Sequence, residues 1–289
     1  MKITNNLGLP QPFVEAVTRE YTYKDKQYSV TALLKGVCQT MLERRYDNVI
    51  EQDVSDMIWL IFGTSVHSIL ENAEETETQL KENKLIIDVN GYKLSGIFDL
   101  YDEATKTVTD YKTATVWKVI NNDWEDYRKQ LLMYAWMLKQ IGFECENGEI
   151  VALLKDHSKT KAKIDSSYPP YPVHKVMFHF TDKDFKEIEE FVFAKFEEIK
   201  KAEQLSDDEL TPCTQEERWQ EPTKYAVKKK GNKRALKIHD SLELANKHCE
   251  SAEGLEIEVR PSIPKKCVDY CNVNGFCKFY QTYLKEKGE

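Results

Sequence analysis

The stretch GIFDLYDEATKTVTDYKT, residues 96–113, predicts a β-hairpin that carries two acids and a lysine. Apolar and polar residues alternate through residues 94–101 and again through residues 107–112, as they do in strands with one buried face. The intervening residues 103–106 predict a tight turn. A turn centred on Ala104 and Thr105 pairs residues whose numbers add up to 209, which sets Asp99 directly opposite Asp110.

Two acids that face each other need a cation nearby. Directly opposed side chains have Cβ atoms about 4.5–5.5 Å apart, and like charges at that distance destabilise a sheet. Because side chains alternate along a strand, Asp110 and Lys112 share a face while Tyr111 points away. An odd loop length would instead send the two acids to opposite faces.

The length and composition describe a globular protein. A chain of 289 residues can form one large domain or a domain with an appendage, and 41% of its residues are hydrophobic. No apolar run approaches the roughly 18–20 residues of a membrane helix, and the first residues lack a signal-peptide core. We therefore expect a cytoplasmic protein that does not bind a membrane.

Charge is unevenly spread along the chain. The net charge of −8 excludes a uniformly cationic surface for nucleic acid. Basic side chains nevertheless gather in KYAVKKKGNKRALK, residues 224–237, and in KDHSKTKAK, residues 155–163. Either stretch can follow a phosphate backbone, and a solvated basic surface is the alternative for both.

The order of predicted elements indicates two parts. Residues 1–25 look irregular, and Ser29 or Thr31 is expected to cap the first helix. The expected helices cover residues 30–47, 53–76, 124–141 and 182–204, and the expected strands cover residues 84–89, 92–102, 106–113, 149–155 and 173–180, the first three forming a meander. A polar break follows, and then strand, strand, helix, strand at residues 224–229, 233–239, 241–249 and 255–260. This order predicts an α/β core at residues 1–205, with a mixed sheet flanked by helices, and a small α+β appendage at residues 206–289.

The spacing of Asp99, Asp110 and Lys112 resembles the PD-(D/E)XK nuclease superfamily, whose acid-x-lysine motif matches DYK at residues 110–112. Two further stretches resemble the RecB-type exonuclease branch. GTSVHSILE at residues 63–71 is similar to its upstream histidine motif, and QLLMYAWML at residues 130–138 is similar to its glutamine-and-tyrosine helix. The four motifs occur in the expected order. The resemblance implies a restriction-endonuclease-like fold for the core.

The resemblance also implies a metal site for phosphodiester hydrolysis. Mg²⁺ or Mn²⁺ prefers oxygen ligands, which Asp99, Asp110 and the carbonyl of Tyr111 supply. His67 would add an imidazole, which suits Mn²⁺ better than Mg²⁺. Lys112 would position the attacking water or stabilise charge on the phosphoryl oxygens.

Gln130 and Tyr134 lie four residues apart, so they share one face of the expected helix. By resemblance they orient Lys112 and contact the DNA strand. Structural alternatives exist for each motif. The two acids and the lysine are alternatively solvated charges on an exposed hairpin, His67 pairs with Glu71 on a helix surface, and Tyr134 belongs to the core.

The C-terminal stretch CVDYCNVNGFC places Cys267, Cys271 and Cys277 close together, as in a four-ligand metal site that lacks one member. RecB-type relatives with a similar cysteine triplet hold a [4Fe–4S] cluster with a distant fourth ligand. Cys213, in the predicted loop ELTPCTQEERW, is the preferred fourth ligand because a loop thiol can reach a metal. Cys38, in a predicted helix, is the alternative.

Zinc competes with iron and sulfur for such a site, since four cysteines serve both. A trio of cysteines without metal is the remaining alternative. A metal there would have a structural role and would hold the tail in place. Cys145 and Cys249 are expected to be ordinary semi-buried thiols.

The resemblance implies a metal-dependent DNA exonuclease, similar to phage or prophage recombination nucleases that resect linear duplex ends for a single-strand annealing protein. Ring-forming relatives such as lambda exonuclease make a homo-oligomer the expected assembly. The alternative is a non-catalytic scaffold that binds DNA ends or supports recombination. The intact acid pair and lysine argue against the scaffold, because opposed carboxylates give it no advantage.

Overall fold

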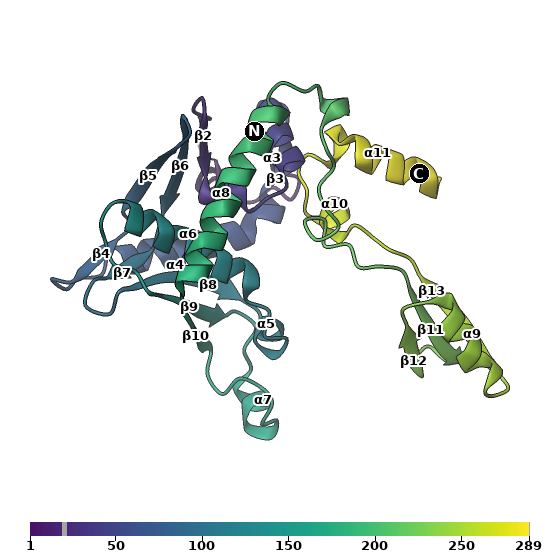
Figure 1. Cartoon of the computed structure of the whole chain (residues 1–289). Coiled ribbons are helices and arrows are strands. Elements are labelled where there is room, and N and C mark those ends of the chain that lie inside the picture. Colours follow the sequence, from purple (N-terminus) through teal and green to yellow (C-terminus); the bar gives the residue numbers. More distant parts are fainter. Residues whose placement is uncertain (19–21, 289) are drawn as a thin grey trace. The chain divides into compact units, whose positions relative to one another are not determined.

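The computed structural model describes residues 1–18 and 22–288 of the chain (Figure 1). The chain divides into two compact units, Met1–Leu205 and Ser206–Glu289. In the part of the chain that the model describes, no helix is long and apolar enough to cross a membrane.

The first unit contains three sheets. Its strands are β1 (Lys2–Thr4), β2 (Gln27–Ser29), β3 (Glu51–Asp53), β4 (Gln79–Lys81), β5 (Lys84–Val89), β6 (Tyr92–Ile97), β7 (Leu100–Asp102), β8 (Thr107–Ala114), β9 (Asn147–Leu154) and β10 (Val173–His179). The main sheet has the order β10-β9-β8-β7-β4, and only β8 and β9 pair in parallel within it. A second sheet has the order β2-β6-β5, and β1 pairs with β3. The main sheet is therefore mixed.

Helices cover these sheets, which gives the restriction-endonuclease-like α/β architecture. The helices of the first unit are α1 (Gln11–Val17), α2 (Val30–Leu33), α3 (Val37–Arg45), α4 (Ile58–Glu71), α5 (Val116–Ile120), α6 (Glu125–Gln140), α7 (Lys159–Ile164) and α8 (Asp182–Ala202). Residues 130–138 of α6 are all buried, because α6 lies between the strands β5, β8 and β9 and the helix α8. In Figure 1, α8 is the long green helix. A capping box of Thr181 and Asp184 starts it.

One carboxylate connects the C-terminal end of α8 with the second sheet. The hydroxyl of Tyr28 donates to Glu203 Oε1 over 2.7 Å, and the hydroxyl of Tyr92 donates to Glu203 Oε2 over 2.6 Å. Both tyrosine side chains are buried. Burying a hydroxyl is costly unless it is hydrogen-bonded, so Glu203 stabilises both β2 and β6 against α8.

Several predicted boundaries are wrong. The helix expected over residues 30–47 is interrupted, since Gly36 has an extended backbone and glycine is a poor helix former. Ser29, one of the two residues predicted to cap this helix, caps its first part, α2. The helix expected from residue 53 begins as a 3₁₀ turn, Val54–Met57, that Asp53 caps. The first 25 residues contain β1 and α1; residues 19–21 of that prediction lie outside the described residues.

The predicted meander is divided between two sheets. The strand expected over residues 92–102 stops at Ile97 and resumes at Leu100, so β6 belongs to one sheet and β7 to the other. The chain before it makes the same change between β4 and β5, where Glu82 has a positive φ of 48°. This backbone bends the chain between β4 and β5, and the paired chain between β6 and β7 is interrupted at the same level. The predicted register of the β7–β8 hairpin is confirmed, because Tyr101 pairs with Val108.

The second unit contains a small sheet and a helical tail. Its elements are a 3₁₀ turn at Asp207–Glu209, β11 (Lys224–Lys229), β12 (Lys237–His239), α9 (Leu242–Glu250), β13 (Leu255–Arg260), α10 (Lys265–Asp269), a 3₁₀ turn at Asn274–Phe276 and α11 (Lys278–Lys287). The sheet has the order β12-β11-β13, and its neighbours are antiparallel. The strand expected from residue 233 begins only at Lys237.

Candidate active site

Three carboxylates occupy adjacent positions across the paired strands. The register of β7 and β8 adds up to 209 and sets Asp99 opposite Asp110. The pairings of β4 with β7 and of β5 with β6 both add up to 181, which sets Asp99 opposite Glu82 as well. The backbone N–H of Glu82 donates to the carbonyl of Asp99 over 3.2 Å. The strands therefore place Glu82, Asp99 and Asp110 in one row.

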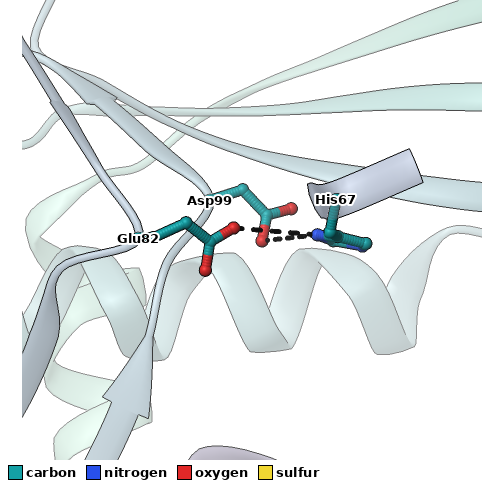
Figure 2. A group of neighbouring side chains, drawn as sticks. All are labelled: His67, Glu82 and Asp99. Atoms are coloured by element: carbon teal, nitrogen blue, oxygen red, sulfur yellow. Dashed lines mark ion pairs between the residues drawn. The ribbon is translucent and has the colours of Figure 1, made fainter. Parts of the chain in front are cut away.

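The helix α4 adds an imidazole to this row. His67 Nδ1 lies 3.1 Å from Asp99 Oδ1 and 3.9 Å from Glu82 Oε1 (Figure 2). One ligand atom from each of these three residues lies within 4.8 Å of the other two. The hydrogen bond to Asp99 raises the pKa of His67 above its ordinary value. The structure thus pairs His67 with acids of the sheet, whereas the alternative placed it beside Glu71.

These distances fit one divalent ion. Ligands about 2.1 Å from an octahedral ion lie about 3 to 4 Å from one another. The distances from His67 Nδ1 to the oxygens of Asp99 and Glu82 fall within this range. Imidazole and carboxylate are a donor set for Mn²⁺ or Mg²⁺. Burial and the neighbouring carboxylates of Asp99 and Glu71 raise the pKa of Glu82. A bound cation would relieve this repulsion.

Glu82 was not among the site residues that the sequence analysis named. It belongs to none of the four motifs, but a signal for it exists in the sequence. The Asn90-Gly91 pair is a strong hairpin signal, and a turn centred on it pairs residues whose numbers add up to 181. Extending that register down the hairpin brings Glu82 opposite Asp99.

Asp110, which is buried, and Lys112, which is partly exposed, form an ion pair. Lys112 Nζ lies 2.6 Å from Asp110 Oδ2, and Lys112 also lies 5.2 Å from the centre of the Tyr127 ring. Asp110 is 3% exposed and Asp99 is 7% exposed, which excludes the alternative of solvated charges on an exposed hairpin. Burial outweighs the attraction of Lys112 and raises the pKa of Asp110 to about 6.

Tyr111 lies between these two residues and holds Asp99 with its backbone. Its N–H donates to Asp99 Oδ2 over 2.6 Å. Its ring centre lies 6.3 Å from that of His67, on the side of α4, whereas Lys112 lies near Tyr127 of α6. The role of the Tyr111 carbonyl as a metal ligand stays a prediction.

Gln130 and Tyr134 are bonded to each other inside the core. Gln130 Nε2 donates to the hydroxyl of Tyr134 over 3.2 Å, and Tyr134 is 4% exposed. The ring packs on Gly96, where an added Cβ would lie only 2.6 Å from Tyr134 Cε1. Tyr134 is therefore a core residue whose hydroxyl is held by Gln130. Contacts of either residue with Lys112 or DNA stay predictions.

A groove of about 580 Å³ lies along α4 beside the metal-ligand group. His67 and Glu82 line it, and so do residues Trp59, Leu60, Gly63, Thr64, Ser68 and Glu71. Trp59 is 60% exposed, and Lys155 Nζ lies 3.7 Å from the centre of its ring. Two of the candidate metal ligands, His67 and Glu82, therefore face this groove.

The second unit brings four thiols into electrostatic contact. Cys267 is buried, and burial followed by the neighbouring Cys271, Cys213 and Cys277 raises the pKa of its thiol to about 12. The binding of an iron–sulfur cluster or of zinc by these four cysteines stays a prediction. Cys38 is buried in α3 of the first unit. Cys145 is fully buried, and Cys249 is half-buried.

Comparisons with known proteins agree with this architecture. The family model of the PD-(D/E)XK nuclease superfamily matches residues 15–278, so the chain belongs to this superfamily. No curated protein shows a significant match.

Solved structures give more distant similarities. SSO0001 is 17% identical, with a TM-score of 0.44 over 64% of this chain and 83% of that one. A phage-related exonuclease from Haemophilus somnus 129PT is 11% identical, with a TM-score of 0.29 over 59% and 75%. LHK-Exo, in complex with dAMP, is 14% identical, with a TM-score of 0.33 over 60% and 91%.

Replacing Glu82 by Gln should weaken Mn²⁺ binding by about tenfold or more, because a ligand that carries the opposite charge to the ion is lost. Isothermal titration calorimetry at pH 7.5 measures the change. Glu71→Gln is the matched control, since Glu71 lines the same groove but lies outside the group of three. Equal affinity of the Glu82 variant and the wild type would remove Glu82 from the site.

Replacing Asp110 by Asn should stabilise the metal-free protein at pH 7 by about 2–3 kcal/mol, which corresponds to the rise in its pKa from 3.8 to about 6. Between these values the folded wild type keeps a proton that the unfolded chain has released. Its free energy of unfolding therefore falls as the pH rises from about 4 to 6. The variant lacks this fall.

Denaturant unfolding in EDTA, repeated across the pH range, tests this. Asp102→Asn, in the same hairpin, is the control and should leave the pH dependence unchanged. An Asp110 variant that is less stable than the wild type at pH 7 would show that the carboxylate stabilises the fold.

Proposed function

We propose that the chain is a metal-dependent DNA exonuclease of the RecB-type branch. The observation that carries this proposal is the row of three acids, of which Asp99 and Asp110 are buried, with His67 on one side and Lys112 on the other. A stable fold gains nothing from burying adjacent carboxylates, and the raised pKa values of Glu82 and Asp110 express that cost. Such groups are typical of sites that bind a cation.

In this proposal His67, Asp99 and Asp110 hold Mg²⁺ or Mn²⁺, together with Glu82 and the carbonyl of Tyr111. The ion, when bound, makes a coordinated water more acidic and polarises the scissile phosphate. Hydrolysis adds the oxygen of one water to phosphorus and breaks the bond to the leaving oxygen, while the water loses a proton and the leaving oxygen gains one.

Lys112 has the central role among the charged groups that do not bind the ion. Its ammonium group donates to a phosphoryl oxygen and stabilises the charge that develops there. The ion pair with Asp110 fixes its position before the substrate enters. By the same resemblance, Gln130 and Tyr134 of α6, which are hydrogen-bonded to each other, orient Lys112 and contact the DNA strand.

The substrates and partners follow from the same proposal. We propose linear duplex ends as the DNA substrate, with a role in end resection during recombination. A single-strand annealing protein would then take the exposed strand, and a homo-oligomer would enclose the duplex, as the resemblance to phage nucleases implies.

Digestion of end-labelled linear and circular duplexes tests the activity. The wild type should degrade only the linear form, with Mg²⁺ or Mn²⁺ and not with EDTA. Asp110→Ala and Lys112→Ala should each lower the rate by at least about 100-fold, since groups acting on transition-state charge have effects of this size. Lys106→Ala is the control, because Lys106 lies at the exposed turn of the same hairpin and pairs with Glu144 and Glu146. Wild-type protein that binds DNA ends but is inactive with every metal would favour the non-catalytic scaffold.

We also propose that Cys213, Cys267, Cys271 and Cys277 bind a [4Fe–4S] cluster, with Zn²⁺ as the alternative. One support is that Cys271, Cys213 and Cys277 lie close enough to Cys267 to raise the pKa of its thiol, in addition to the effect of burial. The other is a pair of contacts between the Cys213 loop and the C-terminal segment. Arg218 donates to the carbonyl of Cys213 and lies 3.9 Å from the Phe279 ring centre, so it connects the Cys213 loop with α11.

Anaerobically purified protein should be coloured and should lose its visible absorbance and part of its stability on oxidation. Cys213→Ser should have the same effect, while Cys38→Ser should keep the absorbance. Colourless wild-type protein that contains zinc would reject the cluster in favour of Zn²⁺.

A further inference from the structure

The connection between β11 and β12 presents five basic side chains to solvent. β12 pairs with β11 only as far as Val227 and Lys237, whereas β11 continues beside β13 to Lys229, so residues 230–236 form the loop between the two strands. The exposed basic residues on this segment, which we call the basic loop, are Lys229, Lys230, Lys233, Arg234 and Lys237. In the range 22–288, none of the five has a carboxylate within ion-pair distance, whereas the chain as a whole carries a net charge of −8.

The basic residues just before this loop behave differently. Lys224 pairs with Asp240 at 2.5 Å. Lys228 lies 3.0 Å from Glu258 and 3.5 Å from Glu256 on β13. The sheet therefore neutralises Lys224 and Lys228, whereas the five residues of the basic loop, which include the last residue of β11 and the first of β12, have no ion pair.

The second basic stretch of the sequence, residues 155–163, is less concentrated. Lys155 lies over the Trp59 ring and Lys161 lies 6.0 Å from the centre of the Tyr168 ring. Asp156 interrupts the stretch and accepts a hydrogen bond from the N–H of Val116. Of the two stretches, the basic loop has the stronger uncompensated positive field.

The chemistry of the loop selects its ligand. It contains no aromatic residue on which a base could stack, so it lacks the main device of single-strand binding. Because β11 is the central strand of a three-stranded sheet, the tip formed with β12 is the part that can approach a groove of DNA, where its lysines reach the phosphates on either side. Contacts of this kind are independent of sequence.

We propose that the basic loop of the second unit binds the phosphate backbone of duplex DNA and holds the substrate independently of the catalytic site. This inference rests on the proposed function in taking DNA as the ligand. It assigns duplex affinity to a part of the chain that lies outside the four nuclease motifs. The released counterions make this affinity depend steeply on salt.

Fluorescence anisotropy of a labelled duplex with the full-length protein in EDTA tests the proposal, because binding is then measured without cleavage. The logarithm of the binding constant is followed from about 50 to 300 mM KCl. A variant with alanine at all five positions of the basic loop should bind more weakly and have a slope smaller by about 4, at about 0.9 for each phosphate contact.

Two control variants make the result specific. Lys224→Ala with Lys228→Ala should change the slope by less than about 1, because these charges are already compensated. A charge-conserving variant, with arginine at the four lysine positions and lysine at Arg234, should restore the wild-type slope. It also shows that the alanine variant does not act through misfolding.

An unchanged slope in the five-alanine variant would overturn the proposal, as would a wild type that binds no duplex. If replacing Lys159, Lys161 and Lys163 by alanine lowered the salt-dependence slope as much as expected for the basic loop, the phosphate contact would be assigned to residues 155–163 instead. Wild-type protein that shows the expected slopes but cleaves no DNA would leave the loop assignment intact and overturn only the nuclease function.

Discussion

Repulsion among three carboxylates in one row is the constraint on which the rest of the site depends. The sheet forces Glu82, Asp99 and Asp110 together, and the surrounding groups reduce the resulting cost. The Tyr111 N–H donates to Asp99, His67 bonds to the same carboxylate, and Lys112 pairs with Asp110. Burial nevertheless keeps the pKa of Asp110 raised, with a smaller contribution from the charge of Asp99. The fold thus trades stability for a group of acids that fits a divalent ion.

Much of this arrangement is contained in local sequence patterns. Alternation of apolar residues and the turn at residues 103–106 determine the register that places Asp99 opposite Asp110, and the structure has that register. Elements with strong periodicity, such as α6 and α8, lie within one or two residues of their predicted bounds. Glu82 was accessible by the same reasoning, because the Asn90-Gly91 turn fixes its partner. It was missed because motif resemblance, rather than strand register, directed the choice of ligands.

Other features depend on tertiary structure that local patterns do not encode. The break between Ile97 and Leu100 arises where two paired strands leave one sheet and join another, and each of the flanking segments looks like a good strand. The position of His67 over Asp99 depends on how α4 packs, so only resemblance pointed to it. The gathering of Cys213 with the C-terminal cysteines likewise requires a loop closure that spacing does not specify.

The shared bend of the two strands at Glu82 and Asp99 has a consequence for the evolution of this chain. Pairing continues with one register on both sides of the bend. The length of the hairpin that turns at Asn90 and Gly91 therefore determines on which side of the sheet each acid lies. A single inserted residue on one strand would rotate one carboxylate to the opposite side of the sheet. Homologous chains that keep the acids should therefore vary the length of this hairpin in steps of two, with the additions shared equally between its strands.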